Sequence, residues 1–321
     1  MHQYNKTCIY LLLITTLGMS PLLAESTEKK WFGQPLPGNE PIRFAAQILY
    51  NMDTEIQFTE IHGAPQFSPD GTLMLLEYQT YNKEAKTYKN SILMATLGKD
   101  GWSNLKPVPF SGNFNNSTPS FHPDGKRLFF VSNRNSESDS EKDDKDFWYV
   151  KYEDQLWGYP KPIGPHVNTK RTEGSPVFTE KGHMYFYRRF DTDNGSGEIM
   201  MSMEDKNGFK TPALVSKLNG DSFEFPVLVD GQNQWLILGT DRGYPEQAGL
   251  YFSRHLEDRK WSTPIRLPQN INGYGLAFTA SLTSDHTYFF FLNRHISDSS
   301  DGPPSREEGL FWLSSSFISK F

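Results

Sequence analysis

Apolar and aromatic residues gather in short runs along this chain, and turn-forming residues separate the runs. Residues 128–131, Leu-Phe-Phe-Val, are too continuously apolar for a strand with one face in water. The preceding residues 119–125, Pro-Ser-Phe-His-Pro-Asp-Gly, read as a short strand and a turn, because proline presets φ and glycine accepts a positive φ. Residues 117–134 are therefore predicted to form a β-hairpin whose second strand is covered on both faces.

The same pattern recurs along the chain. Clear copies stand at 64–71, 175–182 and 225–231, and a weaker copy at 279–285 precedes the aromatic run 288–292. The prolines of the clear copies follow one another at intervals of about 50 to 57 residues: Pro65, Pro119, Pro176 and Pro226. A repeat of about this length that is built from strands predicts propeller blades rather than a helical solenoid.

Each copy is followed by a third apolar run and then by an aromatic residue with a proline, which predicts four strands per blade. The first three strands of a blade recur five times along the chain. A segment for the fourth strand follows only four of these sets. The N-terminal Pro-Ile-Arg-Phe-Ala at 41–45 supplies the fifth. We therefore predict an all-β, five-bladed β-propeller of four-stranded antiparallel blades, closed by the N-terminal strand, which removes the exposed edges of an open ring. The alternative is six blades.

The repeat also resembles a known family. Residues 65–71, Pro-Gln-Phe-Ser-Pro-Asp-Gly, and the aromatic strand that ends in Ser-Asn-Arg at 132–134 are similar to the TolB-like propeller repeat, a relative of WD-type repeats. The resemblance covers about residues 31–321, and residues 33–45 resemble the opening of secreted members. It implies a propeller without the separate N-terminal domain of TolB.

The N-terminus has the layout of a secretory signal peptide. Lys6 precedes an apolar run at 9–17, and small residues stand near Ala24, while the run is too short to span a bilayer. We expect a signal peptide at 1–24, an N-terminal tether at 25–40 and one propeller domain at 41–321. Cys8 is the one cysteine of the chain, so the mature domain has no disulfide or thiol chemistry. The expected location is the periplasm or the extracellular space.

Charge narrows the range of partners. The formal net charge is −6, and no basic block stands in the chain, which argues against nucleic acid and anionic membranes as partners. No long apolar segment follows residue 24, so we expect no membrane insertion, and we expect a monomer. A protein or a glycan is the expected ligand.

The residues that stand just ahead of each first strand are the candidate site. First strands line the central channel of a propeller, so these residues are expected to meet at one mouth. Carboxylates and histidine there could bind a divalent cation such as calcium, or act as acid and base. The competing interpretation is that they solvate a polar channel and satisfy strand ends. The candidates are Glu60, His62, Asn116, Glu173, Glu224 and Tyr274.

Arginine ends the second strand in several blades, as in Arg134, Arg242 and Arg294. Because its forked donors can hold a carboxylate or a backbone carbonyl, we interpret these arginines as clamps between blades, with a ligand-facing ring as the alternative.

Two functions remain open. The chain carries no nucleophile elbow, no His-Glu-x-x-His and no phosphate-binding glycine loop, which favours a secreted binding module for a protein or glycan over an enzyme. The alternative is a hydrolase or lyase that acts on a sugar or lactone at the channel mouth. Fold alone does not decide between them.

Overall fold

The computed structural model describes most of the chain from residue 30 onward. The side chains at 60, 143, 276 and 294 are not described. The described residues are 30–44, 60–82, 84, 86–136, 138, 140–189, 196–244, 246–256, 260–273, 276–294 and 309–321. The expected signal peptide, 1–24, lies outside these ranges. Within them, no helix is long and apolar enough to cross a membrane.

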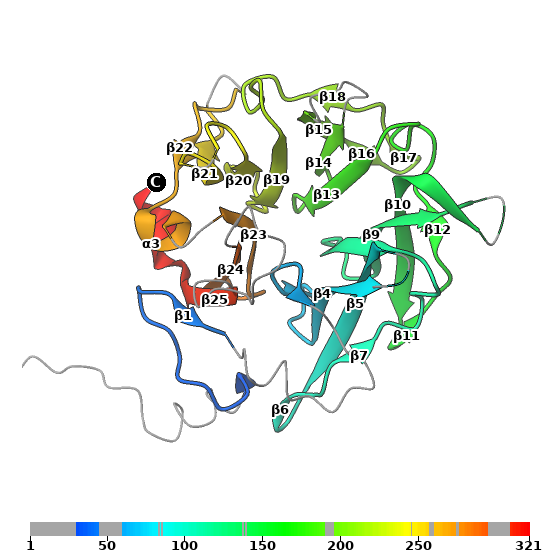
Figure 1. The fold of residues 1–321 in the computed structure, drawn as a ribbon, viewed down its shortest axis with the longest axis horizontal. Coiled ribbons are helices and arrows are strands. Elements are labelled where there is room, and N and C mark those ends of the chain that lie inside the picture. Colours follow the sequence, from blue (N-terminus) through cyan, green and yellow to red (C-terminus); the bar gives the residue numbers. More distant parts are fainter. Residues whose placement is uncertain are drawn as a thin grey trace, which may run out of the picture.

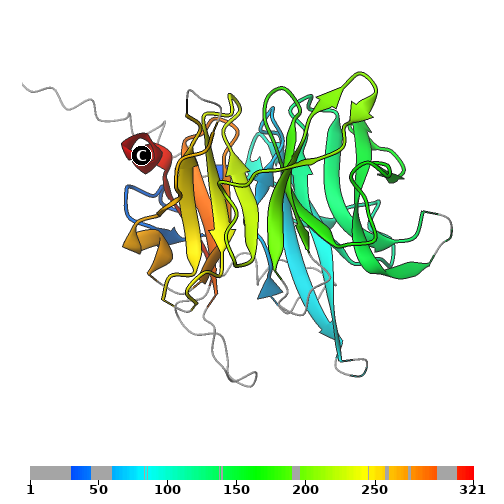
Figure 2. The ribbon, with the colours of Figure 1, turned by 90° about the horizontal axis from the view of Figure 1, so that it is seen from above.

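Five antiparallel sheets stand around one axis as propeller blades (Figure 1), which confirms the predicted fold. Figure 2 shows the ring from the side, with the strands of the sheets running along the axis. The first blade consists of β2 (Glu60–Ile61), β3 (Gln66–Phe67), β4 (Leu73–Asn82), β5 (Thr87–Gly98), β6 (Gly101–Trp102) and β7 (Lys106–Pro107). The second consists of β8 (Asn116–Phe121), β9 (Arg127–Arg134), β10 (Glu141–Glu153), β11 (Leu156–Trp157) and β12 (Lys161–Pro162).

The remaining blades follow the same order from the axis outward. The third holds β13 (Glu173–Phe178), β14 (Met184–Arg189), β15 (Gly197–Ser202) and β18 (Ala213–Leu214), with the hairpin β16 (Glu204–Asp205) and β17 (Gly208–Phe209) beside them. The fourth holds β19 (Glu224–Val229), β20 (Trp235–Thr240), β21 (Gly249–Arg254) and β22 (Ile265–Arg266). The fifth holds β23 (Leu276–Leu282), β24 (Tyr288–Arg294), β25 (Gly309–Ser314) and β1 (Ile42–Arg43). Helix α3 (Gln269–Asn272) precedes β23 in the chain, and the 3-10 helix η1 (Ser315–Lys320) follows β25.

The two ends of the chain close the ring in one sheet. Ile42 pairs with Trp312 and Arg43 with Phe311, and the N–H of Phe44 donates to the carbonyl oxygen of Leu310 at 2.8 Å. The predicted closure is thereby confirmed for 42–44, whereas Ala45 lies outside the described residues. Pairing with β1 covers the edge that β25 would otherwise expose, and β1 becomes the outermost strand of the fifth blade (Figure 1).

Part of the segment that we expected to be a tether contains a buried anchor. Trp31 is 3% exposed, and its ring lies 6.1 Å from Phe44 and 5.4 Å from Trp312 between ring centroids. Trp31 also belongs to a cluster with Met74 of the first blade and Phe290 of the fifth. Aromatic rings in such contacts stabilise beyond the area that they bury, so Trp31 holds together the seam where the ring closes.

Second strands are buried on both faces, as their apolar runs predicted. In β9, four consecutive side chains from Leu128 to Val131 are each at most 3% exposed. Leu128 and Phe130 pack against the first blade, while Phe129 and Val131 pack against the third. The core is thus a series of layers between adjacent blades.

The turn chemistry was also predicted correctly. Gly125 has a φ of 67°, and its N–H donates to the carbonyl oxygen of His122 at 3.0 Å. A side chain there would meet open space, so the demand for glycine comes from the backbone conformation alone.

Candidate functional site

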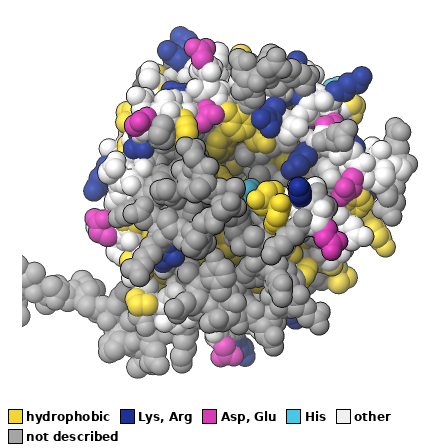
Figure 3. All heavy atoms as spheres, viewed as in Figure 1, with side chains coloured by type: hydrophobic (Ala, Val, Ile, Leu, Met, Phe, Trp, Pro, Cys, Tyr) yellow, Lys and Arg dark blue, Asp and Glu magenta, His cyan; other side chains and the backbone are white. Residues whose placement is uncertain are grey.

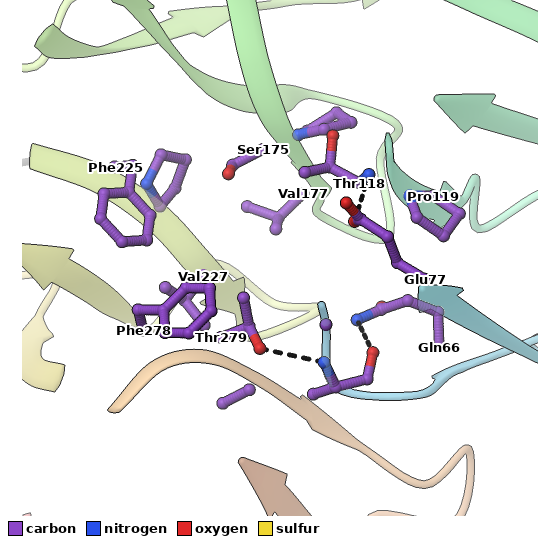
Figure 4. Close-up of a pocket in the computed structure, with 15 residues that line it drawn as sticks. Gln66, Glu77, Thr118, Pro119, Ser175, Val177, Phe225, Val227, Phe278 and Thr279 are labelled. Atoms are coloured by element: carbon purple, nitrogen blue, oxygen red, sulfur yellow. Dashed lines mark hydrogen bonds between the residues drawn. The ribbon is translucent and has the colours of Figure 1, made fainter. Parts of the chain in front are cut away.

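A small cavity lies on the propeller axis, where the first strands of all five blades meet. Its volume is about 60 Å³. Figure 4 shows its walls, with Glu77 and Thr118 on one side and Phe225 and Phe278 on the other. The lining residues are Gly63, Ala64, Gln66, Glu77, Thr118, Pro119, Ser175, Pro176, Val177, Phe225, Pro226, Val227, Phe278, Thr279 and Ala280.

Bulges in the first strands shape this cavity. The pairing of β8 with β9 shifts between Ser117 and Ser120, and that of β13 with β14 shifts between Gly174 and Val177. Inside these shifts Thr118 and Ser175 have φ values of 45° and 52°, a conformation that costs a non-glycine residue about 1–3 kcal/mol. Such bulges re-aim backbone and side chains, and here both bulged residues line the axial cavity.

Glu77 reaches the cavity from a second strand. In the first blade, Ile61 pairs with Tyr78 and Gln66 with Leu75, so four inner residues stand opposite two residues of β4. The first strand is interrupted there, and a Cβ added to Gly63 would lie 3.4 Å from Cβ of Glu77. The break and the glycine together leave Glu77 at the axis rather than behind an inner strand.

The carboxylate of Glu77 is buried and held by neutral donors. Its side chain accepts from Nδ2 of Asn90 at 2.5 Å and from the N–H of Thr118 at 2.8 Å, and the residue is 4% exposed. Burial raises the pKa of Glu77, although the charge of His62, the two donors and the charge of Lys145 oppose the shift. Glu77 therefore keeps a proton at a higher pH than an ordinary carboxyl group does, and it can offer that proton to the cavity.

The other walls combine hydroxyl groups with aromatic rings. Oγ1 of Thr279 accepts the N–H of Ala64 at 2.9 Å, while Oγ1 of Thr118 is buried and has no hydrogen-bond partner within the described part of the chain. A buried polar atom without a partner is rare and marks a place for water or a ligand group. The rings of Phe225 and Phe278 give the opposite wall an apolar face (Figure 4).

Glu173, a predicted site residue, is used inside its own blade instead. It is fully buried, and Oε1 accepts from Nε of Arg188 at 2.9 Å and from Oγ1 of Thr169 at 2.6 Å. Burial raises the pKa of Glu173, while Thr169 and Arg188 oppose the shift. Glu173 is not among the residues that line the axial cavity.

Glu224 and Asn116 occupy equivalent positions in their blades. Oε1 of Glu224 accepts from Nη2 of Arg242 at 3.0 Å, and Oδ1 of Asn116 accepts from Nη2 of Arg134 at 2.9 Å. Both Glu224 and Asn116 are fully buried. The strand-end arginines thus clamp the first strand of their own blade.

Arg134 and Arg188 also bind the incoming loop. Arg134 donates to the carbonyl oxygens of Phe110 and Ser111 at 3.2 Å, and Arg188 to that of Val167 at 2.8 Å. These arginines were interpreted as clamps between blades. In the three blades where the side chain is described, the arginine instead joins two strands of one blade. Arg188 lies directly opposite Glu173, while Arg134 and Arg242 lie two residues beyond Ser132 and Thr240, the residues that pair with Asn116 and Glu224.

His62 is the predicted residue that the structure places beside the cavity. Its backbone N–H donates to the carbonyl oxygen of Glu77 at 2.9 Å, and its ring centroid lies 6.1 Å from that of Phe278. The side chain of Glu60 is not described, and Tyr274 lies outside the described residues. The convergence of all six on one ligand therefore stays a prediction.

A preformed metal site is absent from the described ranges, because no three His, Cys, Asp or Glu side chains there stand close enough to hold an ion. Figure 3 shows one end of the ring, where apolar side chains gather beside the centre next to Lys and Arg side chains.

The signal for Glu77 was present in the sequence. Its strand, Leu-Met-Leu-Leu-Glu-Tyr at 73–78, carries one charge inside an apolar run, whereas the corresponding runs Leu-Phe-Phe-Val and Trp-Leu-Ile-Leu carry none. Thr118 and Ser175 had no comparable signal, since their place depends on the bulges.

Comparison with known proteins bears on the fold. No family model matches the chain, and no curated protein matches it in sequence. The β-1,2-mannobiose phosphorylase of Listeria innocua is similar in structure, with a TM-score of 0.53 and 10% identity over 87% of this chain and 98% of that one.

Two further solved structures are similar. A thermostable family-43 glycoside hydrolase has a TM-score of 0.51 and 8% identity over 80% of this chain and 91% of that one. The catalytic domain of the GH62 α-L-arabinofuranosidase of Coprinopsis cinerea has a TM-score of 0.47 and 12% identity over 82% of this chain and 92% of that one. At these identities, the likeness to the phosphorylase and to the family-43 hydrolase shows a shared β-propeller fold. The resemblance to TolB-like proteins has no support from a family match.

Proposed function

We propose that this chain acts on a carbohydrate at the propeller axis, with Glu77 as the proton donor. The observation that carries the proposal is a buried carboxyl group of raised pKa that lines the axial cavity. Cleavage of a glycosidic bond requires a protonated acid next to the leaving oxygen, and burial is how enzymes keep a carboxyl group protonated near neutral pH.

The size of the cavity sets the orientation of the sugar. Small-molecule sites have volumes of about 300–1,000 Å³, whereas the axial cavity has about 60 Å³. It admits a substituent of the sugar rather than a whole ring. The ring would then lie above the cavity, against the wall of Phe225 and Phe278, with the bond to be cleaved near Glu77. The phosphorylase and the family-43 hydrolase, both sugar-acting by their names, support this choice of substrate class.

A second candidate is sugar binding without catalysis. Two-carboxylate glycosidases hold their acid and their second carboxylate about 5–9.5 Å apart, yet Glu77 is the one acidic side chain among the described residues that line the cavity. This observation favours a binding module, or a reaction in which a nucleophile such as inorganic phosphate needs no protein base.

The test compares turnover with binding. The full chain is incubated with aryl glycosides and disaccharides, with and without inorganic phosphate, and binding of the same sugars is measured by calorimetry. We expect Glu77→Gln to lower kcat by at least about 100-fold and to leave binding in place. Glu153→Gln, at an exposed carboxylate, is the matched control and should behave like the parent. Binding without turnover in the parent would select the binding module, and neither binding nor turnover would overturn both candidates.

A further inference from the structure

A second and larger cavity lies between the third and fourth blades, at the ends of β13 and β19 opposite to those that carry Glu173 and Glu224. Its volume is about 270 Å³. It is formed by the β13–β14 turn, the β19–β20 turn and the residue that follows β21, and these strands stand side by side in the ring (Figure 1). Its polar side chains include Glu180, His183, Gln232, Asn233 and His255.

The two turns are joined to each other. The N–H of Glu180 donates to the carbonyl oxygen of Gly231 at 2.8 Å, and Nε2 of Gln232 donates to Oε2 of Glu180. A Cβ at Gly231 would lie 2.7 Å from Cγ of Glu180, so glycine permits this close approach. The wall of the cavity is thus held by contacts between blades.

A network behind the cavity fixes Asn233 and His255. The hydroxyl of Tyr185 donates to Oδ1 of Asn233 at 3.1 Å, and the Tyr185 ring packs edge-on against Trp261 with centroids 5.9 Å apart. The His255 ring stacks on Trp261 with centroids 4.8 Å apart and planes at 19°. Since Oδ1 of Asn233 accepts from Tyr185, its amide nitrogen is left to donate elsewhere.

The backbone partners of the two histidines set opposite tautomers. Nδ1 of His255 lies 3.0 Å from the carbonyl oxygen of Asn233; because a carbonyl can only accept, this nitrogen carries the proton and Nε2 of the neutral ring is an acceptor. Nδ1 of His183 accepts the N–H of Glu204 at 3.3 Å, so its Nε2 carries the proton and is a donor. Neither Nε2 has a hydrogen-bond partner among the described residues.

We propose that this inter-blade cavity binds a small polyhydroxylated molecule the size of one sugar ring. Each sugar hydroxyl both donates and accepts, and the cavity offers one imidazole acceptor, one imidazole donor, an amide donor and a carboxylate. Its volume stands just below the usual range of small-molecule sites, about 300–1,000 Å³, and suits one ring. The site is separate from the axial cavity and does not rest on the function proposed there.

Histidine nitrogens provide the test. The full chain, with its eight histidines labelled with ¹⁵N, is titrated with D-glucose, D-galactose, D-mannose, D-xylose and L-arabinose, and separately with inorganic phosphate. Before ligand is added, His183 and His255 should show the opposite tautomers. With at least one sugar, the resonances of both should shift in a saturable way, while exposed His166 stays unchanged.

Matched variants distinguish sugar binding in the inter-blade cavity from a nonspecific effect of sugar on the histidine resonances. Asn233→Gly keeps the positive φ of 61° and removes the amide, so it should weaken sugar binding about tenfold. His286→Gly, at the equivalent turn of the fifth blade with φ 57°, should bind like the parent. The proposal is overturned if no sugar shifts the two histidines, if phosphate alone does so, or if Asn233→Gly binds like the parent.

Discussion

Glu77, in the second strand of its blade, and Glu173, at the start of a first strand, are both buried carboxylates, but they have different partners. Burial raises the pKa of each. Glu173 is paired with the guanidinium of Arg188, whereas Glu77 is held by an amide and a backbone N–H and lines the cavity. A buried charge that is paired inside a blade holds strands together. A buried acid whose hydrogen-bond donors are neutral can exchange its proton at a cavity, although the charges of His62 and Lys145 favour the ionised form of Glu77.

The comparison teaches that a raised pKa alone does not mark a functional group. Glu173 shares that shift and is a structural residue of the third blade by its contacts. What distinguishes Glu77 is the interrupted first strand beside it, which puts its side chain on the axis.

The largest effect is expected from Glu173→Ala. It leaves the guanidinium of Arg188, whose side chain is 15% exposed, without its carboxylate. Removing one partner of a buried pair costs about 3–5 kcal/mol, so the free energy of unfolding should fall by about 3 kcal/mol in denaturant titrations. Glu153→Ala, at an exposed carboxylate, is the control. A loss of under about 1 kcal/mol at Glu173 would show that the pair does not hold the blade.

An intermediate effect is expected at the glycines opposite the second strands. A Cβ at Gly174 would lie 2.5 Å from Cε1 of Tyr187, whereas one at Gly63 would lie 3.4 Å from Cβ of Glu77. Gly174→Ala should therefore lower the free energy of unfolding by about 1–3 kcal/mol, the usual range for overpacking. Gly63→Ala should change it by less. Equal losses in thermal unfolding would mean that the two blades leave equal room at this position.

The smallest effect on stability, with a distinctive pH dependence, is expected from Glu77→Gln. Because the folded chain raises the pKa of Glu77 above its ordinary 4.5, the folded state binds this proton more tightly than the unfolded state. The stability that this group contributes is complete below the unfolded pKa and is lost as pH rises through the folded pKa. The melting temperature of the parent minus that of the variant should fall as pH rises above 4.5. A difference that stays constant with pH would contradict a raised pKa.

Much of the fold could be predicted because its determinants are local. Proline, aspartate and glycine at 123–125 specify a turn within a few residues, and the apolar run at 128–131 specifies a strand buried on both faces. The count of strands then required the N-terminal segment to close the ring, and Ile42 does pair with Trp312. Trp31 was missed as an anchor, since nothing in its own neighbourhood indicates which blades it packs against.

The site itself stays a prediction, whereas the structure shows where most of its candidate side chains lie. First strands do surround the axis, as the repeat implied, and His62 does stand beside the cavity. Yet Asn116, Glu173 and Glu224 turn to the arginines of their own blades, while Thr118 and Ser175 line the cavity. A regular alternation of side chains fails at a bulge, and the positive φ values of Thr118 and Ser175 have no marker in residue type.

The sequence by itself determined the repeat, the turns and the all-β class, because these follow from periodicity and from the conformations that proline and glycine allow. It favoured five blades and left six as the alternative, and the structure decided for five. Only the tertiary structure decided which polar groups are paired and which are left for chemistry. Glu77 meets Asn90 and Thr118 from three different strands in two blades, and His183 meets Glu204 across a separate hairpin. Such meetings depend on bulges, breaks and the packing of blades, which act between residues far apart in the chain.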